Sequence, residues 1–258
     1  MNPRIPLLVS HSNQNKKEKL NFIIDTGSNI SLIRENLFMT NGTPKKIQLK
    51  SLSGQMEKEI IELKLNLFDE QEKLIFENSI FHSLSMDSKF NFDGIIGNNI
   101  LEKFDLFLEL PENIFLIKQK QNKIYLKDFN KINFELIEGH IVLPIKLNHF
   151  QCKFILDTGA GLSYLNSKKA KDLNLNIGGN ASFIDLSGAL KETIYHTGEN
   201  LCVDENICQK KIDLLSGNSM EDFLSEDGDL DGILGVNWID KYSILIDYQN
   251  KILYIKQR

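Results

Sequence analysis

The tripeptide Asp-Thr-Gly occurs twice in the sequence, at residues 25–27 and 157–159. A Phe-Ile-aliphatic run precedes each copy, at 22–24 and at 154–156. Two carboxylates that lie face to face can share one proton, so that one accepts a proton while the other donates one. Such a pair activates water at a pH where a lone aspartate is a poor acid and a poor base. The repeated motif therefore predicts a site in which two aspartates act together.

The motif belongs to a longer repeat, because five landmarks recur in the same order in both halves of the chain. Asp25 lies 69 residues before Gly94, and Asp157 lies 75 residues before Gly232. We therefore expect an N-terminal lobe over 1–118, a connector over 119–139 and a C-terminal lobe over 140–258. The landmarks are a Pro-containing apolar segment (5–9 and 143–147), the Asp-Thr-Gly turn, Leu-Ser-Gly (52–54 and 186–188), Gly-apolar-apolar-Gly (94–97 and 232–235) and a terminal hairpin (107–116 and 244–254).

Most segments of both halves are typical of short strands. They are rich in Ile, Phe and Leu, and Gly, Asn and Asp separate them. Only 98–104 and 167–173 are typical of helix, and neither is long enough for an α/β crossover fold. The connector is polar over 119–123 and strand-like afterwards. The sequence predicts an all-β, two-lobed fold with short helices.

Two similar lobes related by a pseudo-two-fold axis would bring Asp25 and Asp157 together at that axis. The ionised partner can take a proton from water as the water attacks an amide carbonyl, and the protonated partner can donate to the carbonyl oxygen. This chemistry requires neither a metal nor a covalent intermediate. The hydroxyls of Thr26 and Thr158 are placed to hydrogen-bond across the axis, and glycine at 27 and 159 lets the backbone pass close to the carboxylates.

These motifs resemble those of the aspartic proteases, and more closely the retropepsin-like branch than pepsin. The resemblance rests on apolar-Asp-Thr-Gly-Ser/Ala at 25–28 and 157–160 and on Gly-Ile-Ile/Leu-Gly at 94–97 and 232–235. It implies a single-chain endopeptidase with two fused lobes, catalytic residues Asp25 and Asp157, and no cofactor. The supporting residues of the two turns would be Thr26, Gly27, Ser28, Thr158, Gly159 and Ala160.

The resemblance also implies a polypeptide substrate that lies between the lobes under one or two hairpin flaps, at 50–56 and 184–190. Candidate substrate-binding residues are Asn29, Gly161, Leu52, Ser53, Gly54, Leu186, Ser187 and Gly188. Viral-type enzymes commonly carry Asp where Asn29 stands; Asn29 could still hold the substrate backbone, whereas Gly161 has no side chain to do so.

The fourth motif position differs between the lobes, since Ser28 stands opposite Ala160. A serine hydroxyl that donates to Asp25 would favour the ionised carboxylate. We therefore expect the two aspartates to be inequivalent, with Asp25 the more acidic.

Composition excludes several other classes of function. A net charge of −5 provides no basic surface for nucleic acid. No apolar stretch approaches the roughly 20 residues that span a bilayer. The segment 227–232 resembles the start of a calcium loop, but Trp238 stands where such a loop needs glutamate, so no metal is expected.

Three cysteines do not make a disulfide framework. Cys202 and Cys208 could pair in an oxidising setting, which would leave Cys152 alone, so we expect reduced thiols. We also expect a cytoplasmic monomer, or an exported protein if a signal peptide precedes this sequence. The alternative to a protease is an inactive peptide- or protein-binding module that uses the same site without turnover.

Overall fold

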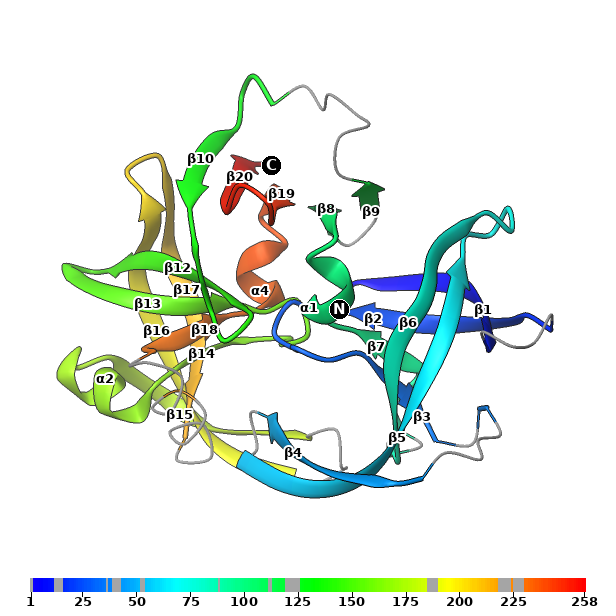
Figure 1. The fold of residues 1–258 in the computed structure, drawn as a ribbon. Helices are drawn as coiled ribbons and strands as arrows, with labels where there is room; N and C mark the ends of the chain where they lie inside the picture. Colours follow the sequence, from blue (N-terminus) through cyan, green and yellow to red (C-terminus); the bar gives the residue numbers. More distant parts are fainter. Residues whose placement is uncertain are drawn as a thin grey trace.

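Two lobes flank a shared sheet in the computed structural model of the chain (Figure 1). Nearly all regular structure is β-strand, which confirms the all-β, two-lobed fold expected from the sequence. The structure describes residues 2–11, 16–35, 37–38, 43–51, 54–87, 89–110, 113–118, 126–184, 190–217, 224 and 230–258.

The N-terminal lobe is a seven-stranded sheet that curls back on itself. Its strands are β1 (Arg4–His11), β2 (Glu18–Ile24), β3 (Leu32–Arg34), β4 (Lys45–Ser51), β5 (Gly54–Phe68), β6 (Leu74–Leu84) and β7 (Gly94–Ile96). They lie in the order β1-β2-β7-β3-β6-β5-β4, and β1 also pairs with β5. The buried strand β7 is parallel to β2 and antiparallel to β3, so the Gly-Ile-Ile segment lies in the middle of the sheet.

The C-terminal lobe repeats this arrangement strand for strand. Its strands are β11 (Glu135–Ile137), β12 (His140–Leu147), β13 (Phe150–Leu156), β14 (Ser163–Leu165), β15 (Asn176–Ile184), β16 (Leu190–Asp204), β17 (Ile207–Ser216) and β18 (Gly232–Leu234). After the extra edge strand β11, the order is β12-β13-β18-β14-β17-β16-β15, and β12 also pairs with β16. This identity of strand order confirms the internal repeat that the sequence predicts.

A third sheet joins the lobes. It contains β8 (Phe104–Glu109), β9 (Asn113–Lys118), β10 (Asn130–Asn133), β19 (Tyr242–Asp247) and β20 (Ile252–Gln257). The order β10-β20-β19-β8-β9 places a strand from each half side by side, with β8 antiparallel to β19. Alternate residues of β8 are buried, as a strand with one face on the core requires. β10 and β11 come from the predicted connector: β10 pairs with β20, and β11 pairs with β12. The lobe boundaries expected from the sequence stay predictions.

The largest hydrophobic cluster is continuous through both lobes and the joining sheet. Phe22 and Phe154, at equivalent positions of β2 and β13, are fully buried in it, together with Trp238. Burial of three large aromatic side chains contributes about 2–3 kcal/mol each. The strands that end at the two Asp-Thr-Gly turns are thus anchored in a rigid core.

Three short helices occur in the described residues: α1 (Asn98–Leu101), α2 (Ser167–Asp172) and α4 (Val236–Ile239). α1 and α2 lie within the segments predicted to be helical, and α4 is the counterpart of α1 in the second lobe. The side chain of Asn166 caps α2 by accepting the backbone N–H groups of Lys168 and Lys169. α1 and α4 each begin directly after the second glycine of a Gly-apolar-apolar-Gly segment.

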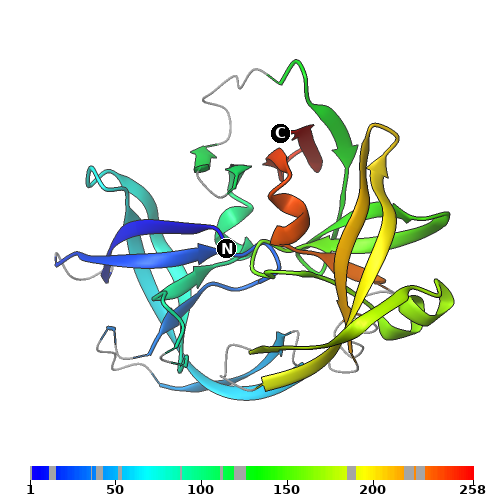
Figure 2. The same ribbon diagram turned by 180° about the vertical axis from the view of Figure 1, so that it is seen from behind.

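Two hairpins lie at the end of the molecule opposite the joining sheet (Figure 2). β4 and β5 pair up to Ser51 and Gly54, and β15 and β16 pair up to Ile184 and Leu190. These hairpins contain the predicted flap segments. The candidate flap residues Leu52, Ser53, Leu186, Ser187 and Gly188 lie outside the described residues.

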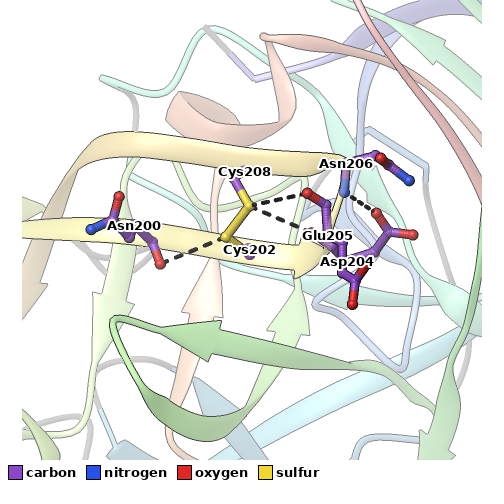
Figure 3. Close-up of a disulfide and its surroundings, with 6 residues drawn as sticks. All are labelled: Asn200, Cys202, Asp204, Glu205, Asn206 and Cys208. Carbon is purple, nitrogen blue, oxygen red and sulfur yellow. Dashed lines mark hydrogen bonds between the residues drawn. A yellow bond between two sulfur atoms is a disulfide. The ribbon is translucent and has the colours of Figure 1, made fainter.

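Cys202 and Cys208 form a disulfide (Figure 3), so the expectation of reduced thiols is wrong for this pair. The register of β16 and β17 places the two residues directly opposite each other, with their Cα atoms 4.1 Å apart. Residue spacing alone does not reveal this register. Cys152 is a free, buried cysteine.

Replacing Cys208 with serine should lower the free energy of unfolding by about 2 kcal/mol, because the disulfide closes a short loop in the unfolded chain. Urea unfolding of wild type and Cys208→Ser, each with and without a reductant, measures the difference. The reductant should affect only the wild type. Equal wild-type midpoints in both conditions would contradict the prediction.

Candidate active site

The two Asp-Thr-Gly turns leave the sheets at equivalent points. β2 ends at Ile24 beside β7, and β13 ends at Leu156 beside β18. The backbone N–H of Asp25 donates to Ile96 O at 3.0 Å, and that of Asp157 donates to Leu234 O at 2.9 Å. Each aspartate is therefore held at the carboxyl end of a parallel strand pair.

Thr26 and Thr158 interlock the two turns. The backbone N–H of each threonine donates to the hydroxyl of the other, at 3.0 and 3.1 Å. Each hydroxyl in turn donates into the opposite lobe: Thr26 Oγ1 to Leu156 O at 2.7 Å and Thr158 Oγ1 to Ile24 O at 2.6 Å. Both threonines are fully buried. Four reciprocal hydrogen bonds in a low-dielectric environment hold the turns rigidly against each other.

The structure brings the two carboxylates together. Hydrogen bonding between the Asp25 and Asp157 side chains contributes to the raised pKa of Asp25. Each carboxylate also lies against the glycine of the opposite turn. A methyl group added at Gly27 would lie 2.2 Å from Asp157 Cγ, and one added at Gly159 would lie 2.4 Å from Asp25 Cγ. Glycine is thus required at both positions by close approach.

Backbone donors hold both carboxylates in place. Gly27 N–H donates to Asp25 Oδ1 at 2.9 Å, while Asp157 Oδ1 accepts from Gly159 at 2.7 Å and Ala160 at 3.0 Å. Burial raises the pKa of both carboxyls. The neighbouring Asp157 charge and the shared hydrogen bond raise the pKa of Asp25 further, whereas the hydrogen bond from Asp25 lowers that of Asp157. The two carboxyls therefore titrate as one coupled pair, with raised pKa values that favour a shared proton.

The contact on which we based the prediction that Asp25 is the more acidic partner is absent from this turn. That prediction assumed that the Ser28 hydroxyl donates to Asp25, but Ser28 Oγ donates to Ile30 O at 2.7 Å. Which of the two aspartates is the more acidic therefore stays a prediction.

Because its hydroxyl faces Ile30, Ser28→Ala should leave the acidic limb of the activity profile unchanged and kcat within about twofold. The lost hydrogen bond should cost about 1 kcal/mol of stability. Activity measured against pH, alongside thermal unfolding, tests both expectations. A displaced acidic limb would mean that the hydroxyl acts on Asp25 after all.

Asn29 and Gly161 occupy different surroundings. The Asn29 amide donates to Glu138 O and lies 3.1 Å from His140 Nε2, in and beside the turn between β11 and β12. In this structure the amide is thus engaged by the other lobe. Gly161 is exposed, and a methyl group added there would lie 3.8 Å from Asn2 Oδ1. Asn2 Nδ2 donates to Gly159 O.

Sequence reasoning missed a pair of serine–asparagine supports beneath the turns. Ser31 Oγ accepts from Gly97 N–H and donates to Asn99 Oδ1, at 3.0 and 2.8 Å. In the second lobe, Ser163 Oγ likewise accepts from Gly235 N–H at 2.9 Å and donates to Asn237 Oδ1 at 2.8 Å. An alignment of the two halves beyond the glycine brackets would have paired these residues.

Asn98, the first residue of α1, was also missed. Its side chain is buried and donates to Thr26 O at 2.7 Å. The repeat obscures it, because the equivalent residue in the second lobe is Val236.

Other kinds of site receive no support from the part of the chain that the structure describes. Among those residues, no group of three or more His, Cys, Asp and Glu side chains could hold a metal ion. Asp231 of the calcium-like segment instead pairs with Lys169 at 2.9 Å, and 227–229 lie outside the described residues. No helix in the described part is long and apolar enough to cross a membrane.

Comparison with protein families gives a match in the N-terminal part of the chain. Residues 2–109 match the family model described as retroviral aspartyl protease, and this range contains Asp25 and the whole seven-stranded sheet. No curated protein matches the sequence significantly. The match supports aspartic protease activity in general and, with it, a peptide substrate. Residues 2–109 are thus similar to a retroviral aspartyl protease domain, and the C-terminal lobe repeats the architecture of these residues around a second Asp-Thr-Gly turn.

Proposed function

We propose that this chain is an aspartic endopeptidase in which Asp25 and Asp157 together activate water for peptide-bond hydrolysis. The observation that carries the proposal is the close approach of Asp25 and Asp157 to each other's turns, which Thr26 and Thr158 interlock. A bound water between the carboxylates would lie within reach of both, as general acid–base catalysis requires.

In the first step, ionised Asp157 takes a proton from the water while the water oxygen bonds to the scissile carbonyl carbon. Protonated Asp25 donates its proton to the carbonyl oxygen, and a neutral tetrahedral diol forms. In the second step, protonated Asp157 donates its proton to the amide nitrogen, ionised Asp25 accepts a proton from one hydroxyl of the diol, and the C–N bond breaks to give the carboxylic acid and the amine. The pair is then back in its starting protonation state, so the cycle needs no cofactor.

The positions of the hairpins support a polypeptide as the substrate. An extended polypeptide bound beneath β4–β5 and β15–β16 would form strand-like backbone hydrogen bonds, which tolerate many sequences. Specificity would then come from side chains that flank the scissile bond. We propose that Gly54, Gly161 and the flap residues 52–53 and 186–188 take part in this binding.

The test is digestion of a peptide library across pH 3 to 8, with cleavage products identified by mass spectrometry. Wild type should cleave internal bonds, and a peptide mimic that carries a hydroxyl at the scissile position should inhibit it. Asp25→Asn and Asp157→Asn should show no cleavage. Peptides that bind without any cleavage by the wild type would instead support an inactive binding module.

A further inference from the structure

A buried polar network ties the Asp25 turn to the opposite lobe. Its centre is Asn98, whose side chain is only 3% exposed. The Asn98 backbone N–H donates to Ser28 O at 2.7 Å, and its side-chain Nδ2 donates to Thr26 O at 2.7 Å. The same Nδ2 donates to Gly139 O at 2.9 Å, in the turn between β11 and β12. One residue therefore holds the catalytic turn of its own lobe and a turn of the other lobe.

Tyr248 sets the orientation of the Asn98 amide. It follows β19 in the joining sheet, is 4% exposed, and donates its hydroxyl to Asn98 Oδ1 at 2.9 Å. Because the oxygen is satisfied by a donor, the Asn98 NH₂ group must face its two carbonyl acceptors. The Tyr248 ring packs edge-on against Phe134, with centroids 6.4 Å apart, so the hydroxyl is held in a fixed position.

At the equivalent positions of the opposite lobe, apolar residues replace this polar pair. Val236 is the counterpart of Asn98, and Leu110, in the turn after β8, is the counterpart of Tyr248. Val236 keeps only the backbone bond, from its N–H to Ala160 O at 2.8 Å. Val236 and Leu110 are buried in the same hydrophobic cluster. The pseudo-symmetry thus preserves the backbone contact and replaces a polar pair by an apolar one.

We propose that Asn98 and Tyr248 are positioning residues that hold the Asp25 turn in register with the C-terminal lobe, and so fix the contact between the two catalytic carboxylates. The inference rests on the proposed function of Asp25 and Asp157. Neither residue touches the reacting atoms. The buried polar groups of Asn98 and Tyr248 would lower stability if they lacked partners. Folding alone does not require a polar pair here, because the apolar pair Leu110 and Val236 fills the equivalent positions of the other half.

The network has a consequence for titration. Contact with Asp157 and burial both raise the pKa of Asp25. When the turns loosen, the carboxylates separate and water enters, so both effects weaken and the upper pKa of the pair falls. Positioning errors of about 1 Å can lower rates by on the order of 10²-fold.

The test compares wild type with Tyr248→Phe, which removes one hydroxyl and keeps the ring. We expect kcat to fall about ten- to a hundredfold with little change in KM, because ground-state binding of the substrate does not depend on the pair. The basic limb of the pH profile should move to lower pH. Carbon NMR titration of the Asp25 and Asp157 carboxyls should show the same downward movement of the upper pKa without any substrate.

Two further variants separate positioning from folding. Asn98→Val combined with Tyr248→Leu copies the buried pair of the opposite lobe, so it should fold while losing the hold on Thr26. It should reproduce the low kcat and the lowered upper pKa. Tyr242→Phe is the matched control, because Tyr242 is a buried tyrosine in the same sheet that packs on Trp238, with ring centroids 4.7 Å apart. It should change neither quantity.

Each outcome decides one question. If Tyr248→Phe and the folded double variant both keep the wild-type kcat and the wild-type titration, the inference is wrong. If the wild type cleaves no peptide but the upper pKa of the pair still falls in both variants, the positioning role holds and the proposed function fails.

Discussion

Replacing either Asp25 or Asp157 with asparagine is expected to lower peptide-bond hydrolysis by on the order of 10⁴-fold or more, the scale seen when a member of a catalytic unit is removed. Asparagine nearly preserves the shape of aspartate, but its amide neither takes a proton from water nor donates one at ordinary pH. Because the two carboxylates act as one unit, the double variant should be no less active than either single variant. Steady-state cleavage of one peptide by all three variants tests this non-additivity.

The same variants should change stability in the opposite direction. The pKa of both carboxyls is raised in the folded protein above the value of about 3.9 in the unfolded chain. A raised pKa contributes stability that is fully present below pH 3.9 and is lost as pH rises through the folded pKa. The asparagine variants have no carboxyl to ionise at the replaced position, so they do not lose this stability as pH rises. Their melting temperatures should therefore be higher than that of wild type at pH 7, and the difference should be smaller at pH 3.

Thermal unfolding at the two pH values checks the sign. Ser28→Ala serves as the control, because it changes the same turn without removing a carboxylate and should melt no higher than wild type at either pH. Asparagine variants that melt lower than wild type at pH 7 would mean that the pair is stabilising when ionised, which its burial contradicts.

The repeated motifs predicted the parts of the site that are local to one turn or common to both lobes. A strand that ends in Asp-Thr-Gly places the carboxylate, and a second copy places its partner once the lobes are related by symmetry. The interlocked hydroxyls of Thr26 and Thr158 follow from that symmetry. Short runs rich in Ile, Phe and Leu, separated by Gly, Asn and Asp, also predicted the strands.

What the sequence did not reveal depends on contacts between residues far apart in the chain or on single bond rotations. Tyr248 and Asn98 are 150 positions apart and break the repeat, so no spacing connects them. The Ser28 hydroxyl donates to Ile30 O and not to Asp25. Rotation about one side-chain bond decides between these acceptors, and the local sequence pattern does not determine that rotation. The disulfide depends on hairpin register, which a shift of one residue would change.

The glycines of the two catalytic turns give a second large expected effect. Gly159→Ala should lower kcat by on the order of 10²-fold or more, because the added methyl group would lie 2.4 Å from Asp25 Cγ and would push the carboxylates apart. Overpacking at such a site typically costs about 1–3 kcal/mol of stability. Gly27→Ala should behave in the same way, since its methyl group would meet Asp157 Cγ at 2.2 Å.

The same turn supplies the matched control. Gly161→Ala makes the identical change two residues away, where the added methyl group would meet nothing nearer than Asn2 Oδ1 at 3.8 Å. It should keep kcat and the wild-type melting temperature, and any effect should fall on KM. Measuring kcat, KM and thermal unfolding for the three variants separates the contributions. If Gly159→Ala stays folded and as active as Gly161→Ala, the carboxylates tolerate separation, and close contact between Asp25 and Asp157 is not what drives catalysis.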